Sequence, residues 1–142
     1  DPMTLARQTA LQAAIYNRLA AELSTAAPSG AAVPVFDHVP QSPPRLHVRI
    51  DGFTVVAVPV KFGATQHARH SVDVHVFDRP LDAGGRGQFE AKRVLGLAHT
   101  ALDGWPPFSG NALTFDDSFV DLDADGATFH ARATYSIILG DT

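Results

Sequence analysis

Three patterns in the sequence predict a domain of the α+β class, in which helices pack against a sheet. Residues 71–77 alternate polar and apolar side chains, as a half-buried strand does, and place Val72, Val74 and Val76 on one face. Residues 94–105 then carry apolar side chains at helical spacing. An Asp-Gly pair further on separates two strand-like runs, which is typical of a β-hairpin. We therefore expect an amphipathic helix to cover the valine face of a sheet.

Composition limits the possible classes of protein. The 142 residues are 45% hydrophobic and 18% charged, which predicts one ordinary globular domain over residues 1–142. Without cysteine, neither disulfides nor thiolate metal sites are possible. A formal charge of -4 is atypical of a general nucleic-acid coat protein, whose affinity comes from clustered lysine and arginine. No apolar run approaches the ~20 residues of a membrane helix and no signal-peptide pattern is present, so we expect no membrane association.

The first part of the chain predicts one helix and two strands. Residues 4–24 are rich in alanine and leucine, which favours a helix. Its apolar positions recur every four residues, at Leu11, Ile15, Leu19 and Leu23. After a loop with proline and glycine, residues 35–36 form a very short predicted strand. Residues 46–51 alternate as a strand, and we expect Gly52 to end it.

Residues 53–60 allow two interpretations. Their valines run on without alternation, which indicates burial on both faces, while Pro59 disfavours a central strand. The segment is either a core strand of the monomer or a protruding arm whose second face is covered by a neighbouring subunit. Residues 62–66 are then expected to turn into a strand over residues 67–77.

The helix that follows the glycine-rich loop is expected to present one apolar stripe to the sheet. Gly104 lies where a left-handed cap is needed, and the two prolines after Trp105 prevent continuation. The stripe consists of Val94, Leu97, Ala98, Ala101, Leu102 and Trp105.

Two predicted strands flank the Asp-Gly turn and form a C-terminal hairpin, over residues 113–122 and 127–139. Centring the turn on this pair opposes Leu122 to Phe129 and Val120 to Ala131. The apolar parity changes within the first strand, which predicts a bulge over residues 118–120. The order of elements is therefore α-β-β-β-α-β-β.

The hairpin tip resembles part of a calcium site. Asp121, Asp123 and Asp125, followed by Gly126, copy the start of a calcium-binding loop. Arg132 occupies the position of the glutamate that closes such a loop, and a strand pattern follows instead of a helix. An acidic hairpin tip is the favoured interpretation.

Three histidines, His67, His70 and His75, lie close together in the sequence. In a strand, His70 points away from the face that the other two share, and those two lie ~27 Å apart at ~3.4 Å per residue. They cannot chelate one ion from one strand. We therefore predict no metal site.

No motif in the sequence indicates catalysis. Residues 84–87 (GGRG) precede a helix, whose N–H groups attract anions, but neither the dinucleotide fingerprint nor the P-loop is present. The nucleophile elbow and the zinc-protease helix motif are also missing. We predict no catalytic residue and no cofactor.

Five short segments, in a fixed order, carry a family resemblance: residues 11–16 (LQAAIY), 35–40 (VFDHVP), 48–50 (VRI), 74–77 (VHVF) and 90–93 (EAKR). The sequence resembles the small tail-completion, or tail-terminator, proteins of long-tailed phages, and most of all the version in alphaproteobacterial gene transfer agents. The resemblance runs from the first helix into the last strand, and residues 89–105 are its most specific block.

The resemblance implies an α+β fold with two helices on a mainly antiparallel sheet, and a structural role without catalysis. It implies a homohexameric ring that caps the head-proximal end of the tail tube, made of the major tail tube protein, and stops its polymerisation. The ring would join the tail to a head-side neck or stopper protein. DNA would pass through the lumen during ejection without sequence-specific binding. The phage-like particle would be assembled in the bacterial cytoplasm.

Five apolar side chains are the expected interface with neighbouring subunits or the tube: Phe53, Val55, Val56, Val58 and Phe62. The alternative is that they fill the monomer core. Two other functional classes stay open. One is a head-side neck adaptor or stopper, and the other is a small enzyme or ligand-binding domain that uses the histidines and residues 121–125.

Overall fold

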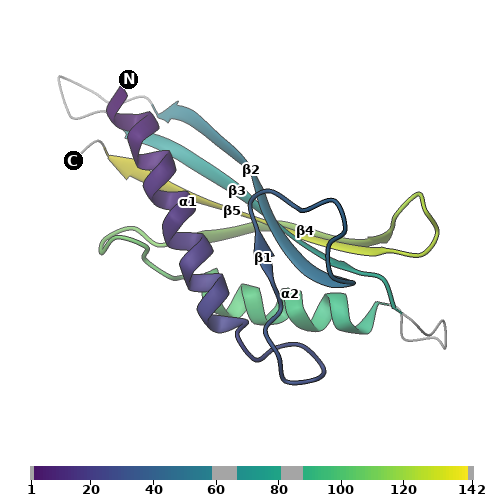
Figure 1. Ribbon diagram of the computed structural model, residues 1–142. Helices are drawn as coiled ribbons and strands as arrows, with labels where there is room; N and C mark the ends of the chain where they lie inside the picture. Colours follow the sequence, from purple (N-terminus) through teal and green to yellow (C-terminus); the bar gives the residue numbers. More distant parts are fainter. Residues whose placement is uncertain (1, 59–66, 81–87, 141–142) are drawn as a thin grey trace.

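The computed structural model describes residues 2–58, 67–80 and 88–140 (Figure 1). Within them, two helices accompany one five-stranded sheet in the predicted order α-β-β-β-α-β-β, which confirms the predicted α+β class. The elements are α1 (Pro2–Glu22), β1 (Val35–Phe36), β2 (Leu46–Val58), β3 (His67–Asp78), α2 (Phe89–Leu102), β4 (Thr114–Leu122) and β5 (Phe129–Gly140).

The sheet is mainly antiparallel, with the strand order β1-β2-β3-β5-β4. β3 and β5 pair along their whole lengths, from His67 opposite Gly140 to Asp78 opposite Phe129. β1 runs parallel to β2 and is only two residues long. β4 pairs with β5 and forms the other side of the sheet. One edge of the sheet is therefore formed by the short β1, and by β2 beyond it, and the other edge is formed by β4.

Both described helices lie on the same face of the sheet (Figure 1), and the core lies between them and the strands. Val72, Val74 and Val76 are completely buried there, as their alternation predicted. The four periodic side chains of α1 are also completely buried: Leu11, Ile15, Leu19 and Leu23. The opposite sheet face, which we call the open face, carries the polar side chains of the same strands.

The predicted stripe of α2 is correct except at Leu97 and at Trp105, which lies beyond the end of the helix and is half-buried against the core. Leu97 is 40% exposed, whereas Ala91 and Leu95 are buried. At 100° per residue, the buried side chains centre on Ala98, and Leu97 lies about 100° from that centre, so the sheet does not reach it. The helix ends at Leu102, and the buried residues are Ala91, Val94, Leu95, Ala98, Ala101 and Leu102. Gly104 has the expected positive φ, at 76°.

The C-terminal hairpin has the predicted register. Leu122 pairs with Phe129 and Val120 with Ala131. The predicted position of the bulge is wrong, because the register shifts between Phe115 and Asp117 and not at residues 118–120. The prediction placed Phe119 on the core face of β4. Phe119 instead faces the open side, so residues 117–122 alternate regularly and the bulge precedes them.

Neither of the two described helices is long and apolar enough to cross a membrane.

Candidate functional site at the two edges of the sheet

β2 does not end at Gly52, as the sequence predicted, but continues through residues 53–58, which we call the arm. The pairing of β2 with β3 shifts between Asp51 and Thr54, where a bulge interrupts the ladder. Gly52 has a φ of 64°, and a Cβ placed there would lie 2.5 Å from Asp73 Oδ2. Glycine therefore allows the strand to continue past the bulge, in a conformation that other residues adopt only with strain.

The arm presents its side chains alternately to the two faces. Val55 lies opposite the buried His70, on the helix face, and Val56 lies opposite Arg69, on the open face. Val56 is 61% exposed. Phe53 packs against the core. Neither interpretation of this segment holds throughout, because its base belongs to the monomer core and its outer part reaches the surface.

The five predicted interface side chains are thus placed differently. Phe53, Val55 and Val58 are half-buried, and Val56 is exposed. Phe62 lies outside the described residues. Their role in an interface stays a prediction.

His70 is a buried polar side chain at the inner side of the arm. It is 1% exposed, and neither ring nitrogen has a hydrogen-bonding partner among the described residues. Burial lowers the pKa of His70, and the nearby positive charge of Arg7 lowers this pKa further. The side chain is therefore a neutral, unsatisfied imidazole within an apolar layer.

His70→Leu is expected to raise the free energy of unfolding by about 1 kcal/mol, because an unsatisfied buried polar group costs about 1–3 kcal/mol. Urea unfolding followed by circular dichroism measures the change. The matched control is His38→Leu at an exposed position, which should stay within about 0.5 kcal/mol of the wild type. A destabilised His70→Leu protein would show that the imidazole has a partner in solution.

The open face carries a chain of ionisable groups in contact with one another, which spans three strands and the hairpin tip. His75 Nε2 lies 2.8 Å from Asp51 Oδ1, and His75 Nδ1 lies 2.6 Å from His130 Nε2. His130 Nδ1 in turn lies 3.5 Å from Asp123 Oδ1. The sequence did not reveal this chain, because His75 and His130 lie on different strands and meet only through the register of β3 with β5.

Aromatic rings continue this cluster along the open face. Phe77 stacks between His47 and His130, with ring centroids 5.2 and 4.3 Å apart. Phe119 on β4 meets His130 edge to face at 5.4 Å. Arg49 lies over the Phe77 ring, with its Cζ 5.1 Å from the centroid. The open face is therefore a row of rings that links β2 to β4.

Burial lowers the pKa values of the histidines in this row. The pKa of His75 is lowered by burial, an effect that the carboxylate of Asp51 opposes in part. The pKa of His130 is lowered by burial and by the neighbouring His75. Burial also lowers the pKa of His47. These imidazoles are consequently neutral at pH 7, and in this form they can stack and form hydrogen bonds with one another.

We expect the stability of the protein to fall as the pH drops below 6.5, the ordinary histidine pKa. The unfolded chain then binds protons that the folded chain binds only at lower pH, so acidification favours unfolding. Urea midpoints at pH 7.5, 6.5 and 5.5 measure this slope. His130→Gln should flatten it, and His38→Gln should not. A midpoint that stays constant or rises on acidification would contradict the expectation.

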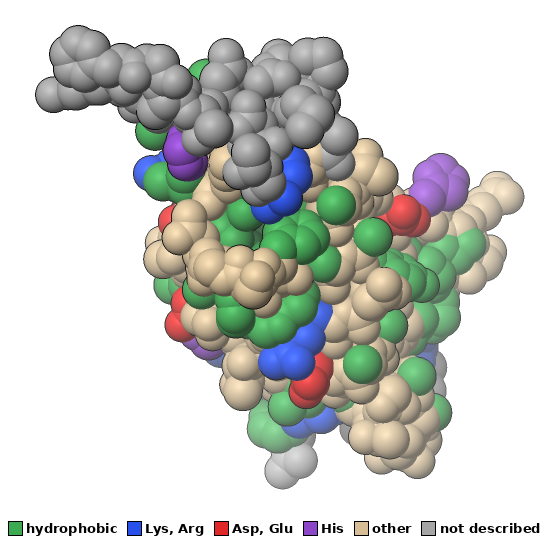
Figure 2. Space-filling view, turned by 90° about the vertical axis from the view of Figure 1, so that its left-hand side faces the viewer, with side chains coloured by type: hydrophobic (Ala, Val, Ile, Leu, Met, Phe, Trp, Pro, Cys, Tyr) green, Lys and Arg blue, Asp and Glu red, His purple; other side chains and the backbone are tan. Residues whose placement is uncertain are grey.

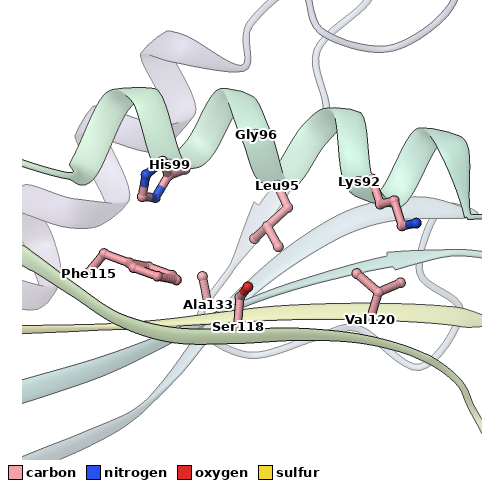
Figure 3. A pocket seen from close by; sticks show the side chains of 8 residues that line it. All are labelled: Lys92, Leu95, Gly96, His99, Phe115, Ser118, Val120 and Ala133. Carbon is pink, nitrogen blue, oxygen red and sulfur yellow. The ribbon is translucent and has the colours of Figure 1, made fainter.

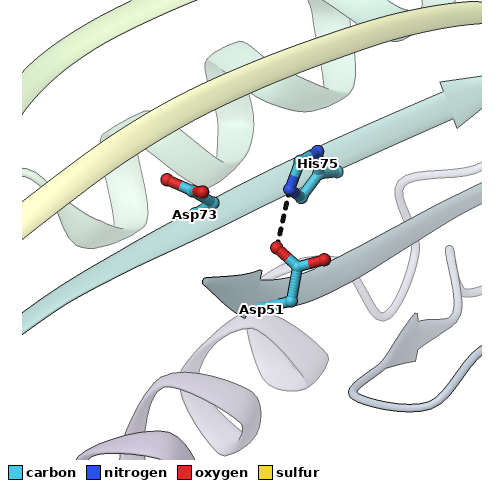
Figure 4. A group of neighbouring side chains, drawn as sticks. All are labelled: Asp51, Asp73 and His75. Carbon is cyan, nitrogen blue, oxygen red and sulfur yellow. Dashed lines mark hydrogen bonds and ion pairs between the residues drawn. The ribbon is translucent and has the colours of Figure 1, made fainter. Parts of the chain in front are cut away.

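Asp51, Asp73 and His75 are the described side chains that come closest to a metal-binding group, with ligand atoms within 4.8 Å of one another (Figure 4). One imidazole and two carboxylates suit several divalent ions. Each side chain is already held by the protein, however: Asp51 by His75 and by Arg49 at 2.7 Å, and Asp73 by the Thr134 hydroxyl at 2.7 Å. We interpret the group as a set of contacts that ties β2, β3 and β5 together.

The acidic hairpin tip stabilises its own turn. Asp125 accepts hydrogen bonds from the backbone N–H groups of Ala127 and Thr128 and from the Thr128 hydroxyl. These bonds lower the pKa of Asp125 to about 2. The contacts support the interpretation of residues 121–125 as a hairpin tip.

A groove of about 360 Å³ lies between α2 and the edge strand β4 (Figure 3). Leu95 lies at its middle, His99 and Phe115 lie toward one end, and Lys92 and Val120 lie toward the other. His99 Nδ1 lies 2.8 Å from the Tyr135 hydroxyl. The groove opens next to an exposed strand and suits apolar side chains of a partner better than a polar substrate. Sequence reasoning missed it, because it depends on how α2 lies across β4.

Figure 2 views the molecule from the left-hand side of Figure 1. Hydrophobic side chains reach the surface there in several places, and basic and acidic side chains are scattered among them. Both signs of charge are present on this side, so it does not resemble the basic patch of a nucleic-acid-binding protein.

The model of the family described as tail completion protein gp17 matches residues 13–140. The chain belongs to this family. Members of the family are structural proteins of virus tails and not enzymes, which confirms both the resemblance and the absence of catalysis predicted from the sequence. The groove is accordingly a surface, and the cluster around His75 and His130 is a set of structural contacts.

Two further comparisons complete this picture. A chain in the solved structure of the virion of a native gene transfer agent particle has the same fold, with a TM-score of 0.69 and 20% sequence identity. The match covers 92% of this chain and 94% of that chain. No curated protein matches the sequence.

Proposed function

We propose that this tail completion protein is the terminator of a phage-like tail. Copies of the chain close into a homohexameric ring on the head-proximal end of the tail tube. The ring stops polymerisation of the major tail tube protein and offers the surface to which the head-side neck or stopper protein binds. The complete particle is a phage or gene transfer agent assembled in the bacterial cytoplasm.

The observation that carries this proposal is the family match over residues 13–140, because it covers the second half of α1, the whole of α2 and the five strands of the described sheet. The fold shared with a chain of a gene transfer agent virion supports it. The arm supplies a surface for assembly, since Val56 is 61% exposed on a strand that projects from the core.

The charge of the chain supports passage of DNA through such a ring. A formal charge of -4 gives a weakly acidic protein, and an acidic or neutral lumen lets DNA slide, whereas clustered lysine and arginine would hold it. No sequence-specific contact with DNA is needed for this role.

Light scattering tests the proposal, with the protein alone and after mixing with purified tail tube protein. We expect the mass of a six-membered ring, or stable co-elution with tubes whose growth has stopped. Electron microscopy of the mixture should show density at one end of each tube. A protein that stays monomeric and ignores the tubes, but binds purified heads, would instead be a head-side adaptor or stopper.

A further inference from the structure

We propose that neighbouring copies in the ring join unlike edges of their sheets. The outer edge of the arm in one copy pairs with the outer edge of β4 in the next copy, so that one continuous sheet runs around the ring. This inference rests on the ring proposed above and names the surfaces that close it.

The first argument is the position of the two edges. In the strand order β1-β2-β3-β5-β4, the arm and β4 lie on opposite sides of one sheet. β1 pairs with β2 only at Val48 and Arg49, so among the described residues no strand covers the outer edge of the arm. β4 is paired with β5 alone. Contacts between two unlike patches on opposite sides are heterologous, and such contacts form a ring when the rotation between copies closes.

The second argument is the composition of the arm edge. Residues 54–58 (TVVAV) contain no charge and no proline, and four of the five are β-branched. Natural edge strands of this kind are normally protected, because exposed N–H and C=O groups recruit another strand. One local cover is present at the base of the arm, where Gln8 Nε2 donates a hydrogen bond to the Phe53 carbonyl at 3.2 Å. The rest of the edge is suited to a partner strand.

The third argument is charge, which selects the partner edge. β4 (TFDDSFVDL) carries three carboxylates and no cation. The arm and the part of β3 opposite it, residues 67–71, carry no carboxylate and include Arg69, which has no ion pair within the described chain. Two β4 edges would bring like charges together, and two arms would leave Asp116 and Asp121 without a cation, since among the β4 carboxylates only Asp117 has a described ion pair, with Arg132. Pairing the arm with β4 joins a neutral-to-basic edge to an acidic one.

The fourth argument is the match of apolar side chains on both faces. In a continuous sheet, Val55 and Ala57 face the same side as α2, where the groove beside β4 is lined by Leu95, Phe115 and Val120. Val56 faces the open side, where Phe119 is 39% exposed. Each face of the added strand therefore finds apolar surface that is uncovered in the single copy.

Cysteine cross-linking tests this pairing, because the native chain contains no cysteine. We place Val56→Cys in the chain together with one further cysteine at each β4 position from 115 to 121, and oxidise the protein on tail tubes. An open-face cysteine reaches only open-face neighbours across a strand pair. We expect covalent ladders up to the full ring for Asp117→Cys, Phe119→Cys or Asp121→Cys, and none for Ser118→Cys or Val120→Cys.

Val55→Cys is the matched partner variant, because it lies one residue away on the helix face. It should reverse the pattern and cross-link to Ser118→Cys or Val120→Cys. Ser24→Cys, exposed outside both edges, replaces the arm cysteine in the control and should give no ladder. The alternation with a period of two is a property of strand pairing that a loose contact does not produce.

The outcomes separate this inference from the proposed function. Capped tubes or rings with no more cross-linking than the Ser24→Cys control would overturn the edge pairing and leave the terminator role intact. Cross-linking without alternation would overturn the continuous sheet in the same way. A chain that forms neither rings nor capped tubes would overturn the terminator role, and the edge pairing with it.

Discussion

Val56→Asp is expected to abolish ring formation and attachment to the tail tube while the monomer stays folded. The side chain is 61% exposed, so the free energy of unfolding should change by only about 1 kcal/mol or less. A carboxylate at this position also faces Arg69 on β3, and such a cross-strand pair contributes roughly 0.2–1 kcal/mol. In the assembly the same carboxylate would lose its hydration against the neighbour's apolar surface and carboxylates, and the desolvation of a charge costs several kcal/mol, more than the pair with Arg69 contributes.

Light scattering with tail tubes, together with circular dichroism, separates assembly from folding in this variant. Ser24→Asp adds the same charge at an exposed position outside the arm and should assemble normally. Phe62→Asp carries the same expectation from the sequence, although Phe62 lies outside the described residues. If Val56→Asp unfolded the monomer, Val56 would belong to the core, and the arm would not be an assembly surface.

Gly52→Ala is expected to lower the free energy of unfolding by about 2–3 kcal/mol. A non-glycine residue at a φ of 64° costs about 1–2 kcal/mol. In addition, the new Cβ would lie 2.5 Å from Asp73 Oδ2, and moving this carboxylate breaks its hydrogen bond with Thr134, worth about 1 kcal/mol. Urea unfolding gives the loss directly.

Gly126→Ala is the matched control for this substitution. Gly126 has a similar φ of 71°, but nothing lies within 4 Å of an added Cβ. It should therefore show only the backbone strain of about 1–2 kcal/mol. If the two variants lost the same stability, Asp73 would move aside freely, and the bulge would not depend on a close approach at Gly52.

Most of the fold could be predicted from local patterns. The burial of Val72, Val74 and Val76 followed from alternation, and the pairing of Leu122 with Phe129 followed from one turn motif. These predictions succeeded because period and turn chemistry act within a few residues along the chain. The predicted end of β2 at Gly52 was wrong, because a glycine can mark either a bulge or the end of a strand. Only the pairing with β3 distinguishes the two.

The candidate site depended on contacts between distant segments. The sequence could not predict whether Val56 is exposed or buried, because a continuous run of valines is compatible with both. The link between His75 and His130 follows from the register of β3 with β5, and the groove beside Phe115 follows from the placement of α2 over β4. Outside the hairpin at the Asp-Gly turn, local pattern carries no information about which strands become neighbours.

The amino-acid sequence by itself therefore determined the elements, their order, the faces that enter the core and the family, because each depends on residue type and short spacing. Only the tertiary structure decided that residues 53–58 extend past a bulge as an arm, that the histidines join across strands, and that an acidic edge and an uncharged edge lie on opposite sides of one sheet. The physical reason is that strand pairing brings together residues from distant parts of the chain, and hydrogen-bond register selects which side chains meet.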